Sequence, residues 1–304
     1  MNWLIVSKRL RKYSAKVHAI TLPEFFSNRF HDTKHVVSSI AALIILAFFS
    51  IYVGSCFATC GKLFHLMFNF DYFTMMVVGA VFVFAYTLLG GFLAESTTDF
   101  IQGTLMFFAL LIVMIGGVVH VGGIDNVVSA LQGYDGYFDL FGITSTQVVD
   151  GALVYGDATS RLTSTGIVGI LSLLAWGLGY FGMPQVLLRF MAIRKPSELR
   201  KSRVIAIVWC VISMAAAIFI GVIGHAMVET SGLFTTSSSA EYIFINMAFV
   251  LLPPFVAGII VSGVLAAAMS SADSYMLITA SAVSKDFFKN VVKKDASEKS
   301  VLWV

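Results

Sequence analysis

Residues 255–274 read FVAGIIVSGVLAAAMSSADS, an apolar run whose second half turns to alanine, serine and one aspartate. The run continues to about residue 283, and a helix needs about 20 apolar residues to cross a bilayer. A membrane β-barrel would instead need short alternating segments of about ten residues. Further continuous apolar runs lie at 37–61, 73–93, 100–122, 165–187 and 204–228. Together with 255–283, they predict an all-α membrane protein with six spans.

The composition of the chain supports the same class of protein. Of its 304 residues, 58% are hydrophobic and only 12% are charged, and the mean hydropathy is +0.87. A soluble domain of this length could not bury so much apolar surface. We therefore expect a single transmembrane domain over residues 1–304, with a lipid bilayer around it and no nucleic-acid partner.

The lysines and arginines are unevenly distributed. All 20 except Lys62 and Arg161 lie before the first predicted span, after the fourth, or after the sixth. Such residues collect in the cytoplasmic loops of membrane proteins. Six spans place these three segments on one side, so we expect a cytoplasmic amino-terminal segment and an external loop at about 123–164.

Both ends of the sequence are apolar. Residues 2–6 resemble the tail of a preceding membrane helix, and residues 301–304 resemble the beginning of another. We therefore expect this sequence to be a fragment of a longer chain.

The last predicted span carries a candidate cation site. Ala267, Ser270, Ser271 and Ser274 have the spacing of one helix face, and hydroxyl and carbonyl oxygens suit a hard cation such as sodium. The same small residues also allow close helix packing, and their hydroxyls can bond back to their own helix. Asp273 favours the ion, because a charge near the bilayer centre costs about 2.5–3.5 kcal/mol and usually marks a functional site. It could also lie shallower and be protonated.

A second acid, Asp99, stands at the start of the third predicted span. It follows Ser96, Thr97 and Thr98, and such a run before an apolar helix is typical of an N-cap. From the local pattern alone, the structural interpretation of Asp99 is the stronger one.

The fourth predicted span is interrupted by WGLGYFGMP at residues 176–184. In transporters, helices broken by glycine and proline expose backbone groups near the membrane midplane. Trp176 and Tyr180 are four residues apart and are expected to share a helix face, where they could cover a small solute or simply pack. Tyr52 in the first span is a further candidate lining residue.

Two other functional classes are open to a helical membrane domain. An enzyme would need a nucleophile, a metal set or paired acids, and neither HExxH nor GxSxG occurs in the chain. We therefore expect no enzyme. A transporter-like sensor or scaffold module is the remaining alternative.

Several motifs along the chain resemble the sodium/solute symporter family, most closely its proline-carrying branch. They are YTLLGGFLA at 86–94, LPEFF at 22–26, RFMA at 189–192, and the stretches 176–184 and 267–274. The resemblance covers essentially all 304 residues. It implies a fold of two inverted repeats of five helices, of which core helices three to eight are present and one, two, nine and ten lie outside this sequence. It also implies a bacterial-type cell membrane.

The resemblance further assigns functional residues. It implies a sodium site at Ala267, Ser270 and Ser271, a second at Asp99, Ser270, Asp273 and Ser274, and substrate contacts at Trp176, Tyr180, Pro184 and Tyr52. The expected activity is sodium-coupled import of a small organic solute by alternating access, with the sodium ion as cofactor. Proline is the first candidate solute, and betaine or pantothenate are alternatives.

Overall fold

The computed structural model describes residues 2–134, 137–138, 142–149, 152–160, 164–231, 241–292, 297 and 300. Its contacts divide the chain into two compact units, which are described separately. The first comprises Met1–Gly103, Gly179–Ile205 and Leu265–Val304, and the second Thr104–Leu178 and Ala206–Val264.

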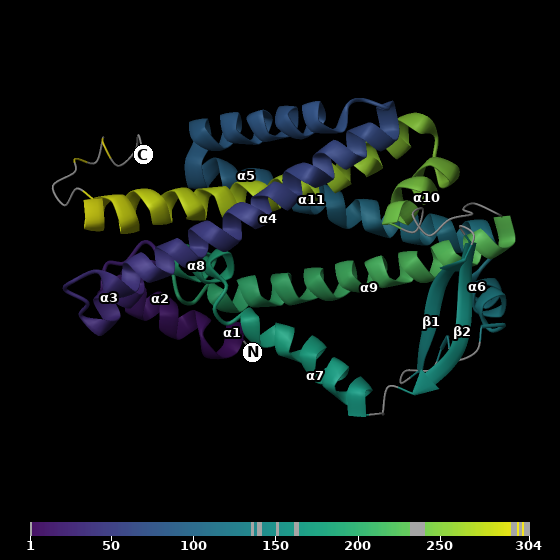
Figure 1. Cartoon of the computed structure of the whole chain (residues 1–304), viewed down its shortest axis with the longest axis horizontal. Coiled ribbons are helices and arrows are strands. Elements are labelled where there is room, and N and C mark those ends of the chain that lie inside the picture. The colour runs from purple at the N-terminus through teal and green to yellow at the C-terminus, as the bar shows by residue number, and fades with distance from the viewer. Residues whose placement is uncertain are drawn as a thin grey trace. The chain divides into compact units, whose positions relative to one another are not determined.

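Helices dominate the described residues (Figure 1). The elements are α1 (Asn2–Ile5), α2 (Ser7–Lys16), α3 (Leu22–Phe30), α4 (Val36–Phe68), α5 (Tyr72–Val121), α6 (Ile124–Leu131), β1 (Gly142–Val149), β2 (Ala152–Ser160), α7 (Ser164–Gly179), α8 (Pro184–Ala192), α9 (Leu199–Ser231), α10 (Ile243–Leu251), α11 (Pro254–Ser281) and the π-helix η2 (Ala282–Val292).

The second and third predicted spans fall within one element, α5. With 50 residues, α5 would be about 75 Å long if straight, more than twice the hydrocarbon thickness of about 30 Å. It is broken at Gly91, where φ is 55° and ψ is −150°. Only glycine adopts this backbone region readily. By length and composition, the described residues contain five helices that could cross a membrane, and α5 counts as one of them although it holds two predicted spans. The six-span topology stays a prediction.

The predicted interruption of the fourth span is present. Helix α7 ends at Gly179, the Gly182 N–H donates to the Gly179 carbonyl at 3.0 Å, and α8 begins at Pro184, where a proline ring suits the first helical position. Tyr180 lies in this turn. The expectation that it shares a helix face with Trp176 is therefore wrong, because the glycines end the helix before it.

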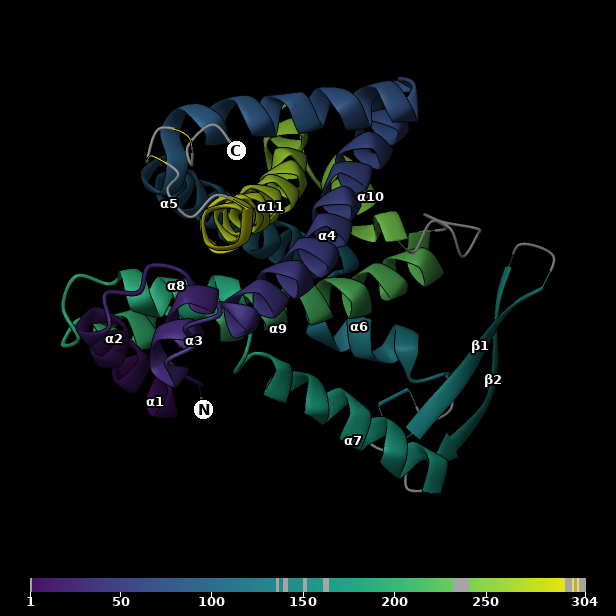
Figure 2. The same ribbon diagram turned by 60° about the vertical axis from the view of Figure 1, so that its left-hand side comes forward.

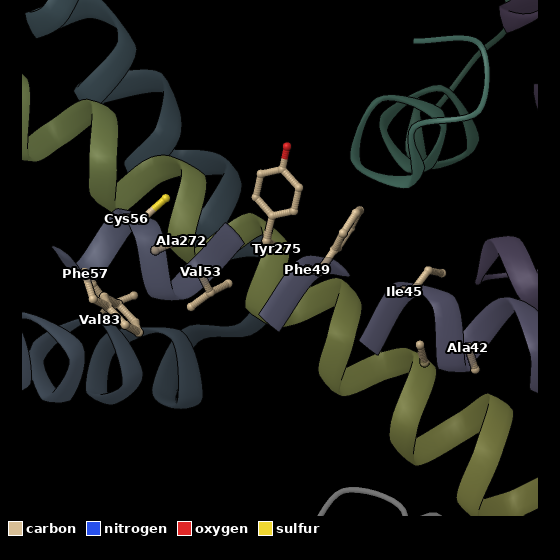
Figure 3. Packing of buried hydrophobic residues seen from close by; sticks show 10 residues of the cluster. Ala42, Ile45, Phe49, Val53, Cys56, Phe57, Val83, Ala272 and Tyr275 are labelled. Carbon is tan, nitrogen blue, oxygen red and sulfur yellow. The ribbon is translucent and has the colours of Figure 1, made fainter. Parts of the chain in front are cut away.

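Two apolar clusters organise the first unit. One joins α4, α5 and α11: its Phe49 and Tyr275 rings are 4.5 Å apart between centroids, and Val53, Val83 and Ala272 are further members (Figure 3). The other joins α2, α3 and α8, which lie together in Figure 1. Its buried members are Leu10, Leu22, Leu187, Phe190, Met191 and Leu199. These clusters hold α8 and α11 in place within the unit.

Residues from opposite ends of the sequence meet at the start of α3. Thr21 forms a capping box there, since its hydroxyl accepts from the Glu24 N–H at 3.2 Å. The same hydroxyl donates to Oδ1 of Asp286 on η2 at 2.9 Å, and Asp286 is only 1% exposed. One threonine thus caps a helix and donates to one oxygen of a buried carboxylate, whose Oδ2 has no hydrogen-bond partner among the described residues.

The start of α5 is also capped by a side chain. Asp71 accepts hydrogen bonds from the Thr74 N–H and the Thr74 hydroxyl, both at 2.8 Å. The backbone hydrogen bond from Thr74, followed by the hydroxyl bond, holds the pKa of Asp71 below its usual value. Asp71 therefore stays ionised at the helix amino terminus, where negative charge is favourable.

We expect Gly61→Ala to destabilise the protein by about 1–3 kcal/mol, the usual cost of overpacking. A methyl group on Gly61 of α4 would lie 2.7 Å from the Tyr72 carbonyl oxygen, and backbone cannot move aside cheaply. The measurement is thermal unfolding in detergent. Gly54→Ala is the control, because nothing lies within 4 Å of its added carbon; equal melting temperatures for the two variants would contradict the prediction.

In the second unit, glycines allow close helix packing. An added carbon on Gly117 of α5 would lie 2.7 Å from Ile223 of α9 and from Met247 of α10.

The segment expected to be an external loop contains helix α6 and an antiparallel hairpin. The two strands of the hairpin, β1 and β2, lie side by side in Figure 2, and their pairing is irregular between Thr144 and Thr146. β-Branched residues in β1 favour a strand.

Candidate functional site

A charged cluster lies inside the first unit, built from three helices. Glu95 and Asp99 stand one turn apart on α5, so they share a face; Arg189 comes from α8, and Asp273 and Ser274 come from α11. Glu95 is 3% exposed and Asp273 is fully buried. Buried charges are stable only when they are paired or coordinate a cation, so the contacts within the cluster decide what it can do.

Arg189 holds one side of the cluster. Its Nη2 lies 2.9 Å from Glu95 Oε1 and 2.5 Å from Asp99 Oδ2, and it donates to the Ser274 hydroxyl oxygen at 2.9 Å. These are charge-assisted contacts, which are shorter and stronger than neutral hydrogen bonds. The Arg189 side chain nonetheless remains 45% exposed, so it joins the buried acids to an open surface.

Asp273 and Ser274 hold the other side. The Ser274 hydroxyl donates to Glu95 Oε1 at 2.6 Å and lies 3.3 Å from Asp99 Oδ2. Asp273 accepts from the Ser274 N–H at 2.6 Å and from the Tyr86 hydroxyl at 2.8 Å, one donor for each carboxylate oxygen. Asp273 is therefore oriented from two directions.

The cluster is suited to a cation. Oxygens of Glu95, Asp99 and Asp273 lie within 4.8 Å of one another, and among the described residues one guanidinium pairs with this group. Three carboxylates against one guanidinium leave excess formal negative charge, which attracts cations strongly in a low-dielectric interior. Asp99 Oδ1 is buried and has no hydrogen-bond partner in the described part of the chain. Oxygen donors of this kind suit hard cations.

The structure brings together three of the four residues assigned to the second sodium site, Asp99, Asp273 and Ser274. The N-cap interpretation of Asp99 is wrong, because α5 is helical throughout this stretch. The hydroxyls of Thr97 and Thr98 donate instead to the carbonyls of Leu93 and Ala94, at 2.8 and 2.9 Å. Such bonds let Ser and Thr sit inside a helix without capping it.

The first assigned sodium site lies one to two turns earlier on α11. The Ser270 hydroxyl donates to the Ala267 carbonyl at 3.1 Å, and Ser271 beside it is half-buried. A bond back to the same helix is the packing alternative that the sequence left open. Ion binding by these three residues stays a prediction.

The residues assigned to solute contacts are distributed over both units. In the first, the Tyr52 ring stacks on Tyr275 at 4.2 Å between centroids, and Gln185 Nε2 donates to the Tyr275 hydroxyl at 2.7 Å. Figure 3 shows that hydroxyl pointing away from the apolar cluster. Tyr180 is exposed, and Trp176 in the second unit is 70% exposed.

Pro184 lines a cavity of about 340 Å³ in the first unit. The wall is mostly apolar, with Phe92, Met191 and Ile278 among its members, and it includes Thr21 and Asp286. The cavity is large enough for a small organic molecule. The solute assignment of Pro184 stays a prediction.

Sequence reasoning missed Glu95, Arg189, Tyr86 and Tyr275. Glu95 could have been found, because it stands four residues before Asp99 and so faces the same way on a helix. Arg189 was assigned to the basic loop after the fourth span, whereas α8 continues to Ala192. Its partners are 90 and 94 positions away in the sequence, and no local pattern indicates them.

Helices long enough to cross a membrane, one of them broken, and a buried ionic cluster between them define an integral multi-pass membrane protein of the transporter class. A solved structure described as the substrate-bound outward-open state of a Na+-coupled sialic acid symporter has the same fold. Its TM-score is 0.73 at 17% sequence identity, over 99% of this chain and 63% of that one. The likeness confirms the predicted fold class.

The chain belongs to the sodium:solute symporter family, whose sequence profile matches residues 1–304. It is 37% identical over 304 residues to the high-affinity proline transporter of Bacillus subtilis, covering 100% of this chain and 60% of the relative. It is 38% identical over 306 residues to the sodium/proline symporter of Haemophilus influenzae, covering 100% and 58%. The chain thus spans less than two thirds of the length of these relatives.

Family membership settles two further expectations. The chain is part of a transporter family and not of an enzyme family. Its apolar helices and its bacterial relatives place it in a bacterial cell membrane as a multi-pass protein.

Proposed function

We propose that the whole protein imports a small organic solute, with proline as the first candidate, by sodium-coupled alternating access. The observation that carries this proposal is the buried cluster of Glu95, Asp99, Asp273 and Ser274, whose negative charge and oxygen atoms suit a monovalent cation. The family and the names of the relatives support both sodium and proline.

Sodium supplies the driving force in this proposal. One elementary charge moving across 100 mV yields about 2.3 kcal/mol, which adds to the free energy of the ion gradient. The ion shifts the conformational equilibrium only by its differential affinity for the two states. One ion binds at Ala267, Ser270 and Ser271, where core helices outside this sequence supply further oxygens, and a second binds at Asp99, Asp273 and Ser274.

The solute lies against aromatic rings. Tyr52 and Tyr275 present stacked rings for its apolar body, and the Gln185 carbonyl oxygen is buried without a hydrogen-bond partner in the described residues. That oxygen can accept from an amino group. The family resemblance adds Trp176, Tyr180 and Pro184 as further proposed solute contacts.

The direct test is uptake of radiolabelled proline by proteoliposomes that contain the whole protein, with and without an inward sodium gradient. Sodium-dependent accumulation supports the proposal. Sodium-driven uptake of betaine or pantothenate, but not of proline, would keep the mechanism and change the solute. No uptake of any of these solutes would favour a sensor or scaffold.

We expect Ser271→Ala to raise the sodium concentration at half-maximal uptake by about threefold to tenfold, the equivalent of one lost neutral contact. The measurement is initial uptake rate against sodium concentration. Ser262→Ala is the matched control on the same helix, because the Ser262 hydroxyl bonds back to the Ile259 carbonyl outside the assigned sites. Unchanged sodium activation in Ser271→Ala would remove Ser271 from the ion site.

A further inference from the structure

Arg189 contacts two of the oxygen donors that the proposed function gives to sodium. Its Nη2 lies 2.5 Å from Asp99 Oδ2 and 2.9 Å from the Ser274 hydroxyl oxygen. A sodium ion bound to the same two oxygens would need the space of that nitrogen and would be repelled by its charge. The two cations therefore exclude each other at these donors.

Glu95 contacts both Arg189 and Ser274, although it is not one of the assigned sodium ligands. Its Oε1 accepts from the Ser274 hydroxyl at 2.6 Å and from Arg189 Nη2 at 2.9 Å. A serine hydroxyl has one hydrogen and two lone pairs. Because the hydrogen points to Glu95, the lone pairs of Ser274 remain available to a cation.

We propose that Arg189 is a tethered cation that competes with sodium for Asp99 and Ser274, and that Glu95 is the positioning residue that orients the Ser274 hydroxyl so that its lone pairs face the ion. The inference rests on the proposed function, since it takes sodium as the competing ion. Arg189 has room to withdraw, because 45% of its side chain is exposed and its stem is long and flexible.

The exchange of sodium for Arg189 would keep the carboxylates of the cluster paired when the ion has left. A transporter must return without its ion, and buried carboxylates stripped of their cation are strongly destabilising. With Arg189 in contact with Asp99 and Glu95, the ion-free cluster keeps one positive charge. Arg189 thus weakens sodium binding, whereas Glu95 strengthens it, because its negative charge attracts the ion and its carboxylate accepts the Ser274 hydrogen that would otherwise face the ion.

The test is equilibrium binding of radioactive sodium to the purified whole protein in detergent. We expect Arg189→Ala to lower the half-saturating sodium concentration by about fivefold or more, and Glu95→Gln to raise it by a similar factor, the range of a typical coupling between two sites. Arg194→Ala and Glu198→Gln are matched controls, because these two residues form an exposed ion pair at 2.8 Å outside the cluster. Neither control should change sodium binding.

Direct competition makes a second prediction, which a change in the electrostatic potential alone would not produce: free guanidinium should also compete with sodium. Millimolar guanidinium chloride added to Arg189→Ala should raise the half-saturating sodium concentration without lowering the number of sites. Choline chloride, as the matched salt, should not. Arg189→Lys keeps a tethered charge and should bind sodium more weakly than Arg189→Ala. If the alanine variant does not fold, Arg189→Gln, which removes the charge but keeps a long polar side chain, takes its place in both comparisons.

Unchanged or weaker sodium binding in Arg189→Ala, or a guanidinium effect no larger than that of choline, would overturn the inference. Sodium binding that shifts in opposite directions in the two variants, together with no sodium-driven uptake, would overturn the proposed function and leave the competition standing. Absence of sodium binding in the wild type would overturn both.

Discussion

Asp99→Asn raises the half-saturating sodium concentration of uptake by about 100-fold or more. The substitution keeps the shape of the side chain but removes the charge of a proposed sodium ligand beside the Ser274 hydroxyl. Removing one charged partner from a binding contact away from water costs about 2–5 kcal/mol, and each 1.4 kcal/mol corresponds to about a factor of ten. The measurement is initial uptake rate as a function of sodium concentration in proteoliposomes.

Asp71→Asn is the control for this change. Asp71 precedes the same helix but caps it through Thr74, and asparagine caps a helix about as well as aspartate does. Its sodium dependence should match that of the wild type. If Asp99→Asn shifted sodium activation no more than Asp71→Asn does, Asp99 would not be an ion ligand.

The second large effect is expected from Gly91→Ala, which should destabilise the protein by about 1–3 kcal/mol and lower the maximal rate of sodium-driven uptake. Gly91 has φ 55° and ψ −150°, a conformation that an alanine side chain opposes. Tyr86 precedes the break, and Glu95 and Asp99 follow it. Straightening α5 would move the Tyr86 hydroxyl relative to the two carboxylates.

Thermal unfolding and uptake measured on one preparation would test both parts of this prediction. Gly103→Ala lies on the same helix, where nothing within 4 Å would meet the added carbon. It should leave stability unchanged or raise it by about 0.5–1 kcal/mol, the usual gain of alanine over glycine inside a helix. A Gly91→Ala variant as stable and active as Gly103→Ala would show that the break is not required.

The class of fold could be predicted from the sequence because its signal is local. Each apolar run is long enough by itself to predict a membrane helix, and three glycines and a proline predict the break at residues 176–184. Helix bounds were less predictable. Helix α4 extends to Phe68, beyond the expected 61, because apolar length indicates where a bilayer could lie and not where the backbone hydrogen bonds stop.

The candidate site was predictable only in part, for a related reason. Asp273 and Ser274 stand out as polar residues within an apolar run, and the resemblance supplied Asp99. The role of Arg189 depends on a contact between α8 and α5 that no spacing along the chain encodes.

The hydrogen bond from Thr21 to Asp286 also bears on how the protein is made. The two residues are 265 positions apart, and a ribosome adds about 5–20 residues per second. Roughly 13 to 53 seconds therefore separate the synthesis of one partner from that of the other at this rate. During this interval the Thr21 hydroxyl lacks its Asp286 partner, so the contact that joins α3 to η2 forms only late in synthesis.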